Sequence, residues 1–452
     1  MRIKLTAILL VLSIGISTAQ QKKWTLEECV TYAVENNLTI EQFELDLENI
    51  KIDEKDALGD LLPNLNASTT LSKNVGFTIV STSNVPTTGN QSTFNANGGF
   101  SSNLTLFDGL RNIKRLNRAK LAAISSQYRL DDLKDDIRLR VANAYLQILS
   151  NKEALKVSKA QYAFTEQDMK RTKELVDSGV VPKGDLLEIE ATAANQEQQI
   201  VNNESLVLIS TINLAQLLQI TDYENFGIAD ESFDIPFSDV LNNSPKSIFA
   251  KALEFRNDIK LAKSNVELAE KDLEIAKGAY LPTLTGFFQY GTRYSDATGP
   301  VPDGSGGVFT PGFKDQLWIF DGISYGAQLN IPLFNGWSTK NSVSRSKISL
   351  EKSKLQFEQD KLDLESDIQN AYVDVTTFYK SYEAAEKTLE ARRLAYQYSK
   401  DRFDVGLMNS FDFSQAQSRV DNAEADVIRT KYNYIFRLKI LEFYFGIPIS
   451  LN

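Results

Sequence analysis

The chain carries the hexapeptide LTLFDG at residues 104–109 and a second version of it, IPLFNG, at residues 331–336. Other landmarks recur with the same spacing. A separation of 227 positions relates Phe107 to Phe334, Tyr145 to Tyr372, Gly179 to Gly406 and Asp185 to Asp412. A constant separation over so long a stretch indicates a tandem duplication. Each half of the chain is therefore expected to repeat one structural plan.

The composition excludes several classes of protein. The 452 residues include no histidine and a single cysteine, Cys29, and the net charge is -10. Histidine is the commonest general base and metal ligand, so a catalytic or zinc centre is not expected. One cysteine cannot form a disulfide within the chain, and an acidic chain does not suit nucleic acid. We therefore expect no cofactor, no metal, no nucleic-acid partner and no enzymatic activity.

The first residues have the pattern of an export signal. Arg2 and Lys4 precede an apolar run at residues 5–16, and the small residues Ser17-Thr18-Ala19 follow it. This arrangement predicts a signal peptide over residues 1–19. No other stretch approaches the roughly 20 apolar residues that a membrane-spanning helix needs. The mature chain is therefore expected to be exported without a membrane-spanning helix.

Helices are predicted at the start of each copy. Thr25 and Glu28 have the spacing of a capping box, and helical pattern continues from there to Pro63. The second copy has a similar segment that ends before Pro282. These patterns predict N-terminal helices within residues 20–64 and residues 247–282, with a linker at residues 221–246.

Two segments alternate between apolar and polar residues, as half-buried strands do. They cover residues 65–107 in the first copy and 283–334 in the second, and each is predicted to form a β-hairpin. Polar Ser/Thr/Asn/Gly/Pro-rich loops are expected inside them, at residues 79–92 and 295–316. The sequence thus predicts four strands, each with one apolar and one polar face.

A helical hairpin follows each strand pair, over residues 108–220 and 335–452. Residues 110–178 and 337–405 contain neither proline nor glycine, which allows helices of roughly 100 Å at 1.5 Å per residue. Apolar residues in the second copy step alternately by four and three, as in a coiled coil. They are Leu364, Ile368, Ala371, Val375, Phe378, Tyr382, Ala385 and Leu389.

Four amphipathic strands cannot close into a barrel by themselves. Two chains would supply eight strands, whose side chains fill the interior, whereas three chains would supply twelve and leave a passage. We therefore expect a mainly α protein with membrane β structure: a trimeric, 12-stranded β-barrel with four strands per chain, and long coiled-coil helices that project on the periplasmic side.

With these features in place, the chain resembles outer membrane efflux proteins of the TolC family over nearly its whole mature length. The matching residues are Thr25-Leu26-Glu27-Glu28 through Glu35-Asn36-Asn37, Leu62-Pro63 and Leu281-Pro282, Phe107-Asp108-Gly109 and Phe334-Asn335-Gly336, and the turns Gly179 to Asp185 and Gly406 to Asp412. The resemblance implies a homotrimer in the lipid of the outer membrane, whose β-barrel is continued by a long α-helical coiled-coil barrel in the periplasm. It also implies a passive exit duct for efflux or type I secretion, coupled through a periplasmic adaptor (membrane fusion) protein to an inner membrane transporter.

Four residues are candidates for the periplasmic entrance of such a duct: Asp185, Glu188, Asp412 and Gln415. A trimer would repeat each of them three times around one mouth, and rings of carboxylates favour cations. The alternative is structural, because acidic residues in a first helical turn stabilise the helix start, and Asn409 and Asp412 have capping spacing. The family resemblance implies aspartates at the positions of Asp412 and Gln415, so glutamine here implies a weaker ring. It also implies an arginine at the position of Met408.

The turns between the long and short helices are candidates for adaptor docking, through Gly179, Val181, Gly406, Leu407 and Met408. After a glycine that ends a helix, the next apolar side chain often packs back onto that helix. Val180 could pack in this way on Leu175, whereas Leu407 would face Arg402. We therefore expect Leu407 and Met408 to be more available to a partner. An exported coiled-coil protein or adhesin is the alternative function, but it leaves the duplicated hairpins unexplained.

Overall fold

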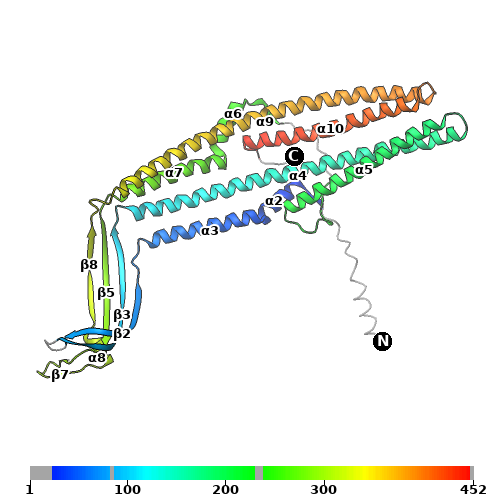
Figure 1. The fold of residues 1–452 in the computed structure, drawn as a ribbon. Helices are drawn as coiled ribbons and strands as arrows, with labels where there is room; N and C mark the ends of the chain where they lie inside the picture. The colour runs from blue at the N-terminus through cyan, green and yellow to red at the C-terminus, as the bar shows by residue number, and fades with distance from the viewer. Residues whose placement is uncertain (1–22, 82–85, 230–237, 448–452) are drawn as a thin grey trace, which may run out of the picture. The chain divides into compact units, whose positions relative to one another are not determined.

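The computed structural model describes residues 23–81, 86–229 and 238–447 (Figure 1). The predicted signal peptide at residues 1–19 lies outside the described residues. The chain divides into two compact units. We call residues 1–46, 127–261 and 357–452 the helical unit, and residues 47–126 and 262–356 the sheet unit. Each unit combines segments from both copies of the repeat.

The two copies contain the same main elements in the same order. The first has α2 (Leu26–Asn36), α3 (Leu38–Gly59), β2 (Asn66–Ser81), β3 (Pro86–Phe107), α4 (Arg111–Asp177) and α5 (Lys183–Leu217). The second has α6 (Pro245–Phe255), α7 (Asn257–Gly278), β5 (Thr283–Ser295), β8 (Gly322–Asn330), α9 (Ser338–Asp404) and α10 (Ser410–Phe445). Helices α4 and α9 contain 67 residues each, which confirms the two long helices predicted from the missing prolines and glycines.

Short elements accompany these. Strands β1 (Lys23–Trp24) and β4 (Gly227–Ile228) pair in parallel, and a 3-10 helix, η1, covers Asp239–Asn242. Strands β6 (Val301–Pro302) and β7 (Val308–Phe309) lie within residues 295–316, the stretch predicted as a loop, and helix α8 (Phe313–Ile319) begins within it. No described helix combines the length and apolar character needed to cross a membrane.

The start of each copy differs from the sequence prediction in one respect. The predicted capping box is confirmed, since Glu28 N–H donates to Thr25 Oγ1 (3.3 Å) and Thr25 N–H donates to Glu28 Oε2 (3.0 Å). The helix does not continue unbroken to Pro63, however, because Asn37 adopts an extended conformation between α2 and α3. Its Oδ1 then accepts from Thr39 N–H (2.9 Å), which starts the next helix. Arg256 makes the equivalent break between α6 and α7.

The sheet unit contains one antiparallel sheet in the order β2-β3-β5-β8 (Figure 1). Its register confirms the predicted faces, because paired residues lie on the same side of a sheet. One row runs across all four strands through Ala67, Phe100, Tyr290 and Ile323. The adjacent row runs through Asn66, Ser101, Gln289 and Ser324. One face is thus apolar and the other polar, with β2 and β8 as the edge strands.

The predicted loop at residues 79–92 is too long. Strand β2 continues to Ser81 and β3 begins at Pro86, with an unbroken antiparallel register from Asn66↔Ser101 to Ser81↔Pro86. The ladder is made by backbone groups, so Ser, Thr, Asn and Gly do not prevent it. Their abundance therefore marked a polar stretch of the hairpin and made the predicted loop longer than the connection between β2 and β3.

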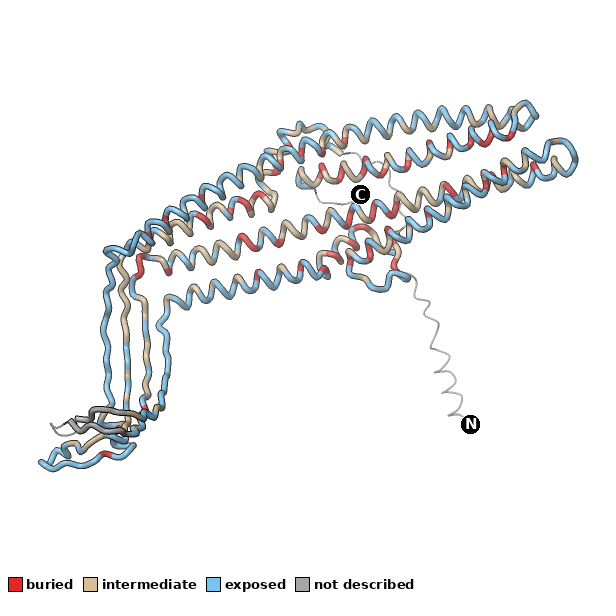
Figure 2. The backbone as a smooth tube through the Cα atoms, in the orientation of Figure 1, coloured by how far each residue is buried: buried red, intermediate tan, exposed pale blue. Residues whose placement is uncertain are grey.

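The helical unit is held together by the predicted heptad residues. Leu364, Ile368, Ala371 and Val375 of α9 are buried in one cluster with residues of α6 and α10, including Ile248, Leu438 and Leu441. In the first copy, Ile137, Val141 and Ile148 are buried on α4. Figure 2 shows the buried residues recurring along these helices as separate points on otherwise exposed or half-buried ribbon. This pattern is that of a coiled-coil seam.

Candidate functional site

The two helical hairpins reverse at turns of the same type. Gly179 has φ +74° and Gly406 has φ +76°, conformations that glycine adopts at little cost. Val180 N–H donates to the Leu175 carbonyl (2.9 Å), and Leu407 N–H donates to the Arg402 carbonyl (2.8 Å). These bonds define Schellman motifs, which satisfy the last carbonyls of α4 and α9.

Both turns present an apolar side chain to solvent. Val180 is 67% exposed and Leu407 is 71% exposed. The expected difference between them is therefore not found: the backbone of Val180 bonds back to Leu175, but its side chain stays outside. Val181 and Met408 are both half-buried.

The start of α10 is capped as the structural interpretation of Asp412 predicts. Asp412 N–H donates to Asn409 Oδ1 (2.8 Å), and Asn409 Nδ2 donates to Asp412 Oδ2 (3.0 Å). Asp412 is nevertheless exposed. Asn409 can therefore cap α10 while the carboxylate of Asp412 remains accessible.

Asp185 joins the two hairpins. The hydroxyl of Ser410 donates to its Oδ1 over 2.7 Å, which links the start of α10 to the start of α5. Close to this bond, Arg171 of α4 pairs with Asp404 of α9 (2.7 Å). Sequence reasoning singled out Asp185 but missed Ser410, because the position matching Ser410 in the first copy is Lys183 and no repeated pattern marks it.

Polar contacts continue along both hairpins. Side chains of α4 or α5 hydrogen-bond to α10 at intervals of about one turn. The pairs are Thr192 and Ser414 (3.2 Å), Gln417 and Thr165 (2.7 Å), Gln196 and Asp421 (3.0 Å), and Gln161 and Glu424 (2.9 Å). Within the second hairpin, Phe403 of α9 stacks on Phe413 of α10 with ring centroids 4.5 Å apart. Polar side-chain contacts thus join the two hairpins.

The predicted entrance residues do not line one common cavity. Glu188 and Gln415 line a polar cavity of 470 Å³ between α4, α5 and α10. Asp185 instead lines a 540 Å³ cavity at the turns, together with Val181, Leu407 and Met408. Asp412 contributes to the lining of neither cavity. The structure therefore places Glu188 and Gln415 in one cavity, Asp185 in the other and Asp412 in neither.

A half-buried carboxylate that the sequence did not single out, Asp421, lies in the first of these cavities. Burial, together with the charge of the neighbouring Glu424, raises the pKa of Asp421 from 3.8 to about 6, although the hydrogen bond from Gln196 opposes the shift. The first copy has Ala194 at the matching position, so the repeat gave no signal for it.

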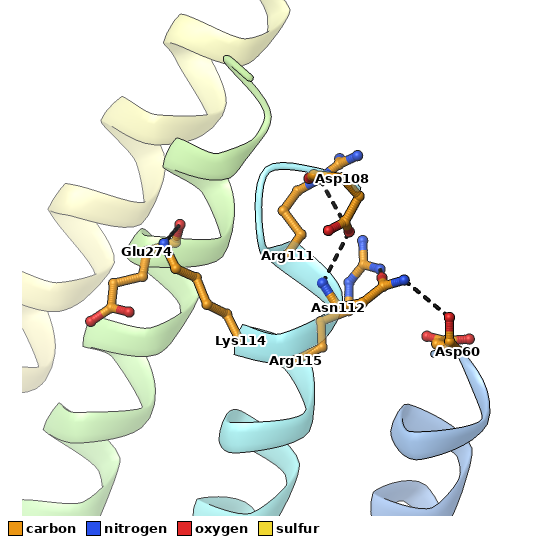
Figure 3. Close-up of polar contacts among 7 residues, drawn as sticks. All are labelled: Asp60, Asp108, Arg111, Asn112, Lys114, Arg115 and Glu274. Carbon is orange, nitrogen blue, oxygen red and sulfur yellow. Dashed lines mark hydrogen bonds and ion pairs between the residues drawn. The ribbon is translucent and has the colours of Figure 1, made fainter. Parts of the chain in front are cut away.

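The repeated Phe-Asp/Asn-Gly motif marks the junction between β3 and α4 (Figure 3). Asp108 caps α4, since Asn112 N–H donates to its Oδ2 (3.0 Å), and Arg111 Nε donates to its carbonyl (2.8 Å). Asn112 Nδ2 reaches the Asp60 carbonyl at the end of α3 (3.1 Å). Lys114 Nζ reaches the Glu274 carbonyl of α7 (3.2 Å), so α4 contacts a helix from each copy.

These features match those of a known protein family. The model of the outer membrane efflux protein family matches residues 31–218 and 248–446, one match for each copy of the repeat. The chain belongs to the outer membrane efflux protein family. It is therefore an outer membrane protein with a periplasmic extension, and its family is one of channels for transport.

Individual members of the efflux family are distant in sequence and close in fold. The chain is 20% identical to the outer membrane protein TolC of Vibrio cholerae over 300 residues, which span 66% of this chain and 64% of that protein. It therefore matches just under two thirds of the length of that relative. The CmeC outer membrane channel of Campylobacter jejuni has a TM-score of 0.78 at 17% identity, covering 93% of this chain and 85% of CmeC. VceC of Vibrio cholerae has a TM-score of 0.78 at 14% identity, covering 94% and 97%.

Proposed function

We propose that this efflux family protein is the exit duct of a tripartite efflux or type I secretion system, and that it conducts passively. The observation that carries the proposal is the four-stranded sheet with one apolar and one polar face and two open edges, β2 and β8. An apolar outer face suits lipid, and a polar inner face suits a water-filled passage. The 67-residue helices that follow the strands would continue the passage into the periplasm.

The duct is a homotrimer in this proposal. Open sheet edges expose unsatisfied backbone groups, which cannot remain so in lipid. Three copies supply the twelve strands that leave a lumen, whereas eight would fill it with side chains. Native mass measurement in detergent should therefore give three copies, and a stable monomer or dimer would contradict the barrel.

A periplasmic adaptor is proposed to dock at the hairpin turns and to couple the duct to an inner membrane transporter. The supporting observation is the pair of exposed apolar side chains, Val180 and Leu407, beside the half-buried Val181 and Met408. Gly179 and Gly406 would set the turn geometry that presents them. An adaptor's helical hairpins could cover these side chains by coiled-coil packing.

Leu407→Asp tests the docking surface. We expect it to abolish export and capture of the adaptor while the trimer reaches the outer membrane in normal amounts. Leu394→Asp, at an exposed leucine further along α9, controls for damage to the helix. Unchanged export by Leu407→Asp, or an effect explained by less trimer, would place docking elsewhere.

The entrance is proposed to be lined by Asp185, Glu188, Asp412 and Gln415 from all three copies. Asp412 is exposed and Asp185 half-buried, so both carboxylates could act on ions in the mouth. Replacing both by asparagine keeps oxygen acceptors for Ser410 and Asn409 and removes the charge. The variant should lose cation selectivity and block by trivalent cations in planar bilayers. Unchanged ion selectivity combined with a melting temperature lowered by several degrees would show that the two residues act only as structural caps.

A further inference from the structure

The four strands of the sheet unit are almost free of charge. Over the ranges given above, β2, β3, β5 and β8 contain only two charged residues, Lys73 on β2 and Arg293 on β5. Successive side chains of a strand point to opposite faces, so the register decides to which face each charge belongs. A charge on the polar face matters most, because that is the face that suits water.

The register places the two charges on opposite faces of the sheet. Arg293 lies four residues along β5 from Gln289, which belongs to the polar row, and an even step keeps a side chain on the same face. Lys73 lies six residues along β2 from Ala67, which belongs to the apolar row. Within these strands, Arg293 is therefore the one charged residue on the polar face.

The surroundings of Arg293 hold its side chain without neutralising it. The guanidinium lies over the ring of Phe320, 5.1 Å from the ring centroid. A cation–π contact of this kind orients the cation and leaves its charge in place. Arg293 is exposed, and no carboxylate forms an ion pair with it within residues 23–81, 86–229 and 238–447. The guanidinium is thus a positioned and accessible positive charge.

A cavity of 640 Å³ lies beside this charge. Asn97, Gln289 and Phe320 line it together with Arg293, and Asp321 is the one carboxylate among its lining residues. Neutral amide groups and an aromatic ring therefore stand beside the guanidinium. A planar guanidinium donates paired hydrogen bonds to carboxylates and phosphates. The cavity can thus receive an anionic group.

The other acidic residues of the connection between β5 and β8 are held by backbone groups. Asp296 accepts a hydrogen bond from Phe94 N–H (2.8 Å), and Asp315 accepts one from Gly312 N–H (3.1 Å). Asp303 accepts hydrogen bonds from two N–H groups of its own turn (both 2.9 Å). These carboxylates stabilise the connection, and none of them forms an ion pair with the guanidinium.

We propose that Arg293 is a selectivity-determining residue of the duct, and that it favours anionic cargo with carboxylate or phosphate groups. The inference rests on the proposed function, because three copies of the chain would place three Arg293 side chains around one passage. This ring lies near the strand ends that lead into the connection between β5 and β8. Its charge is opposite to that of the carboxylates proposed for the periplasmic entrance, so it reduces the preference of the duct for cations.

The size of the effect follows from the screening of charges in water. The Debye length is about 10 Å at 0.1 M salt, so the three charges act across a narrow passage. Three unit charges roughly 10 Å from a permeating ion should change the ratio of K⁺ to Cl⁻ permeability about two- to fourfold. At 1 M salt the Debye length falls to about 3 Å, and most of the effect should disappear.

Reversal potentials of the full-length protein in planar bilayers, measured across a KCl gradient around 0.1 M, test the proposal. Arg293→Gln should raise the ratio of K⁺ to Cl⁻ permeability about two- to fourfold. Arg293→Lys keeps the charge and should keep the ratio of the parent. Lys73→Gln is the matched control, since it removes the charge of the apolar face and should leave the ratio unchanged.

Block by inorganic pyrophosphate gives an independent measurement. Pyrophosphate added on the side of the strand hairpins should reduce the current through the parent protein. Arg293→Gln should need a several-fold higher concentration for the same block. Arg293→Lys should need an intermediate concentration, because an ammonium group lacks the paired donors of a guanidinium.

The outcomes separate this inference from the proposed function. A conducting Arg293→Gln variant with the permeability ratio and the block of the parent would overturn the inference and leave the duct intact. An equal change in Lys73→Gln, or a change that persists at 1 M salt, would also overturn it, because the effect would not come from the charge of Arg293. If Arg293→Gln fails to insert, absence of pyrophosphate block in the parent would overturn it instead. Inserted parent protein that does not conduct would overturn the duct and this inference together.

Discussion

The hydroxyl of Ser410 donates a 2.7 Å hydrogen bond to Oδ1 of Asp185, and this bond ties the start of α10 to the start of α5. Ser410 is buried, so the loss of its hydroxyl leaves the carboxylate without this donor. Hydrogen bonds to charged groups contribute roughly 1.5–3 kcal/mol, and partial exposure of Asp185 lowers this to about 1 kcal/mol.

Ser410→Ala should therefore lower the free energy of unfolding by about 1 kcal/mol, as measured by thermal unfolding of the purified protein. If the entrance proposal holds, looser hairpins should also raise single-channel conductance. Ser418→Ala, at an exposed serine on the same helix, should change neither quantity. Equal effects of the two substitutions would remove any special role of the Ser410–Asp185 bond.

The second prediction concerns the turn at Gly406, where φ is +76° and a Cβ would meet no atom within 4 Å. Gly406→Ala should destabilise the protein by roughly 1–2 kcal/mol through backbone strain alone, because L residues disfavour this conformation. Gly184→Ala is the matched control. It lies in helix α5 with equal space around it, and should stabilise by up to about 1 kcal/mol. Opposite signs are expected in chemical denaturation, and equal signs would contradict the turn geometry.

The third prediction follows from Asp421, whose pKa burial raises from 3.8 to about 6. A carboxyl that is more easily protonated in the folded state stabilises that state at low pH. Its contribution is complete below about pH 4 and is lost as the pH rises through about 6. Asp421→Asn should therefore gain stability relative to the parent between pH 4 and pH 7.5. A gain of about 1–2 kcal/mol is expected after allowance for partial exposure.

Melting temperatures of the parent and of Asp421→Asn, measured in parallel from pH 4 to pH 7.5, check this. Asparagine keeps an oxygen acceptor for Gln196, so the hydrogen bond is not the variable. A difference between the two proteins that does not change with pH would contradict the assignment of the raised pKa to Asp421.

The fourth prediction concerns the heptad seam of α9. Ile368 is completely buried among α6 and α10, so Ile368→Ala should leave a cavity and cost about 2–5 kcal/mol. Ile368→Val removes one methylene and should cost about 1 kcal/mol. Urea denaturation measures both. Similar small losses for the two variants would show that the seam repacks and does not depend on close interdigitation.

The sequence pattern predicted helices and strands correctly where interactions between neighbouring residues determine them. The absence of proline and glycine placed α4 and α9 within one residue of their ends, and alternation placed Phe100 and Ser101 on opposite faces of the sheet. Thr25 and Glu28 marked a helix start because both bonds of a capping box lie within four residues. Spacing alone was sufficient in these cases.

Contacts between residues far apart in the sequence could not be predicted from local sequence patterns. Ser410 and Asp421 acquire their roles from side chains of α5 that are more than 200 positions away in sequence. Asn37 interrupts a periodic helical pattern because its own side chain restarts the helix, a competition that periodicity does not register. Val180 stays exposed although its N–H bonds back to Leu175, so the rule for side chains after a helix-ending glycine predicted the backbone correctly but not the side chain.

Reconstitution of the purified protein into planar lipid bilayers tests the central proposal most directly, namely that the chain assembles into a passive conducting duct. Stepwise conductance should appear on insertion without any energy source, favour cations, and fall when a trivalent cation is added on the side of the hairpin turns. The account would be contradicted if correctly assembled, inserted protein produced no conductance steps at any voltage, and if the double variant Asp185→Asn, Asp412→Asn produced none either.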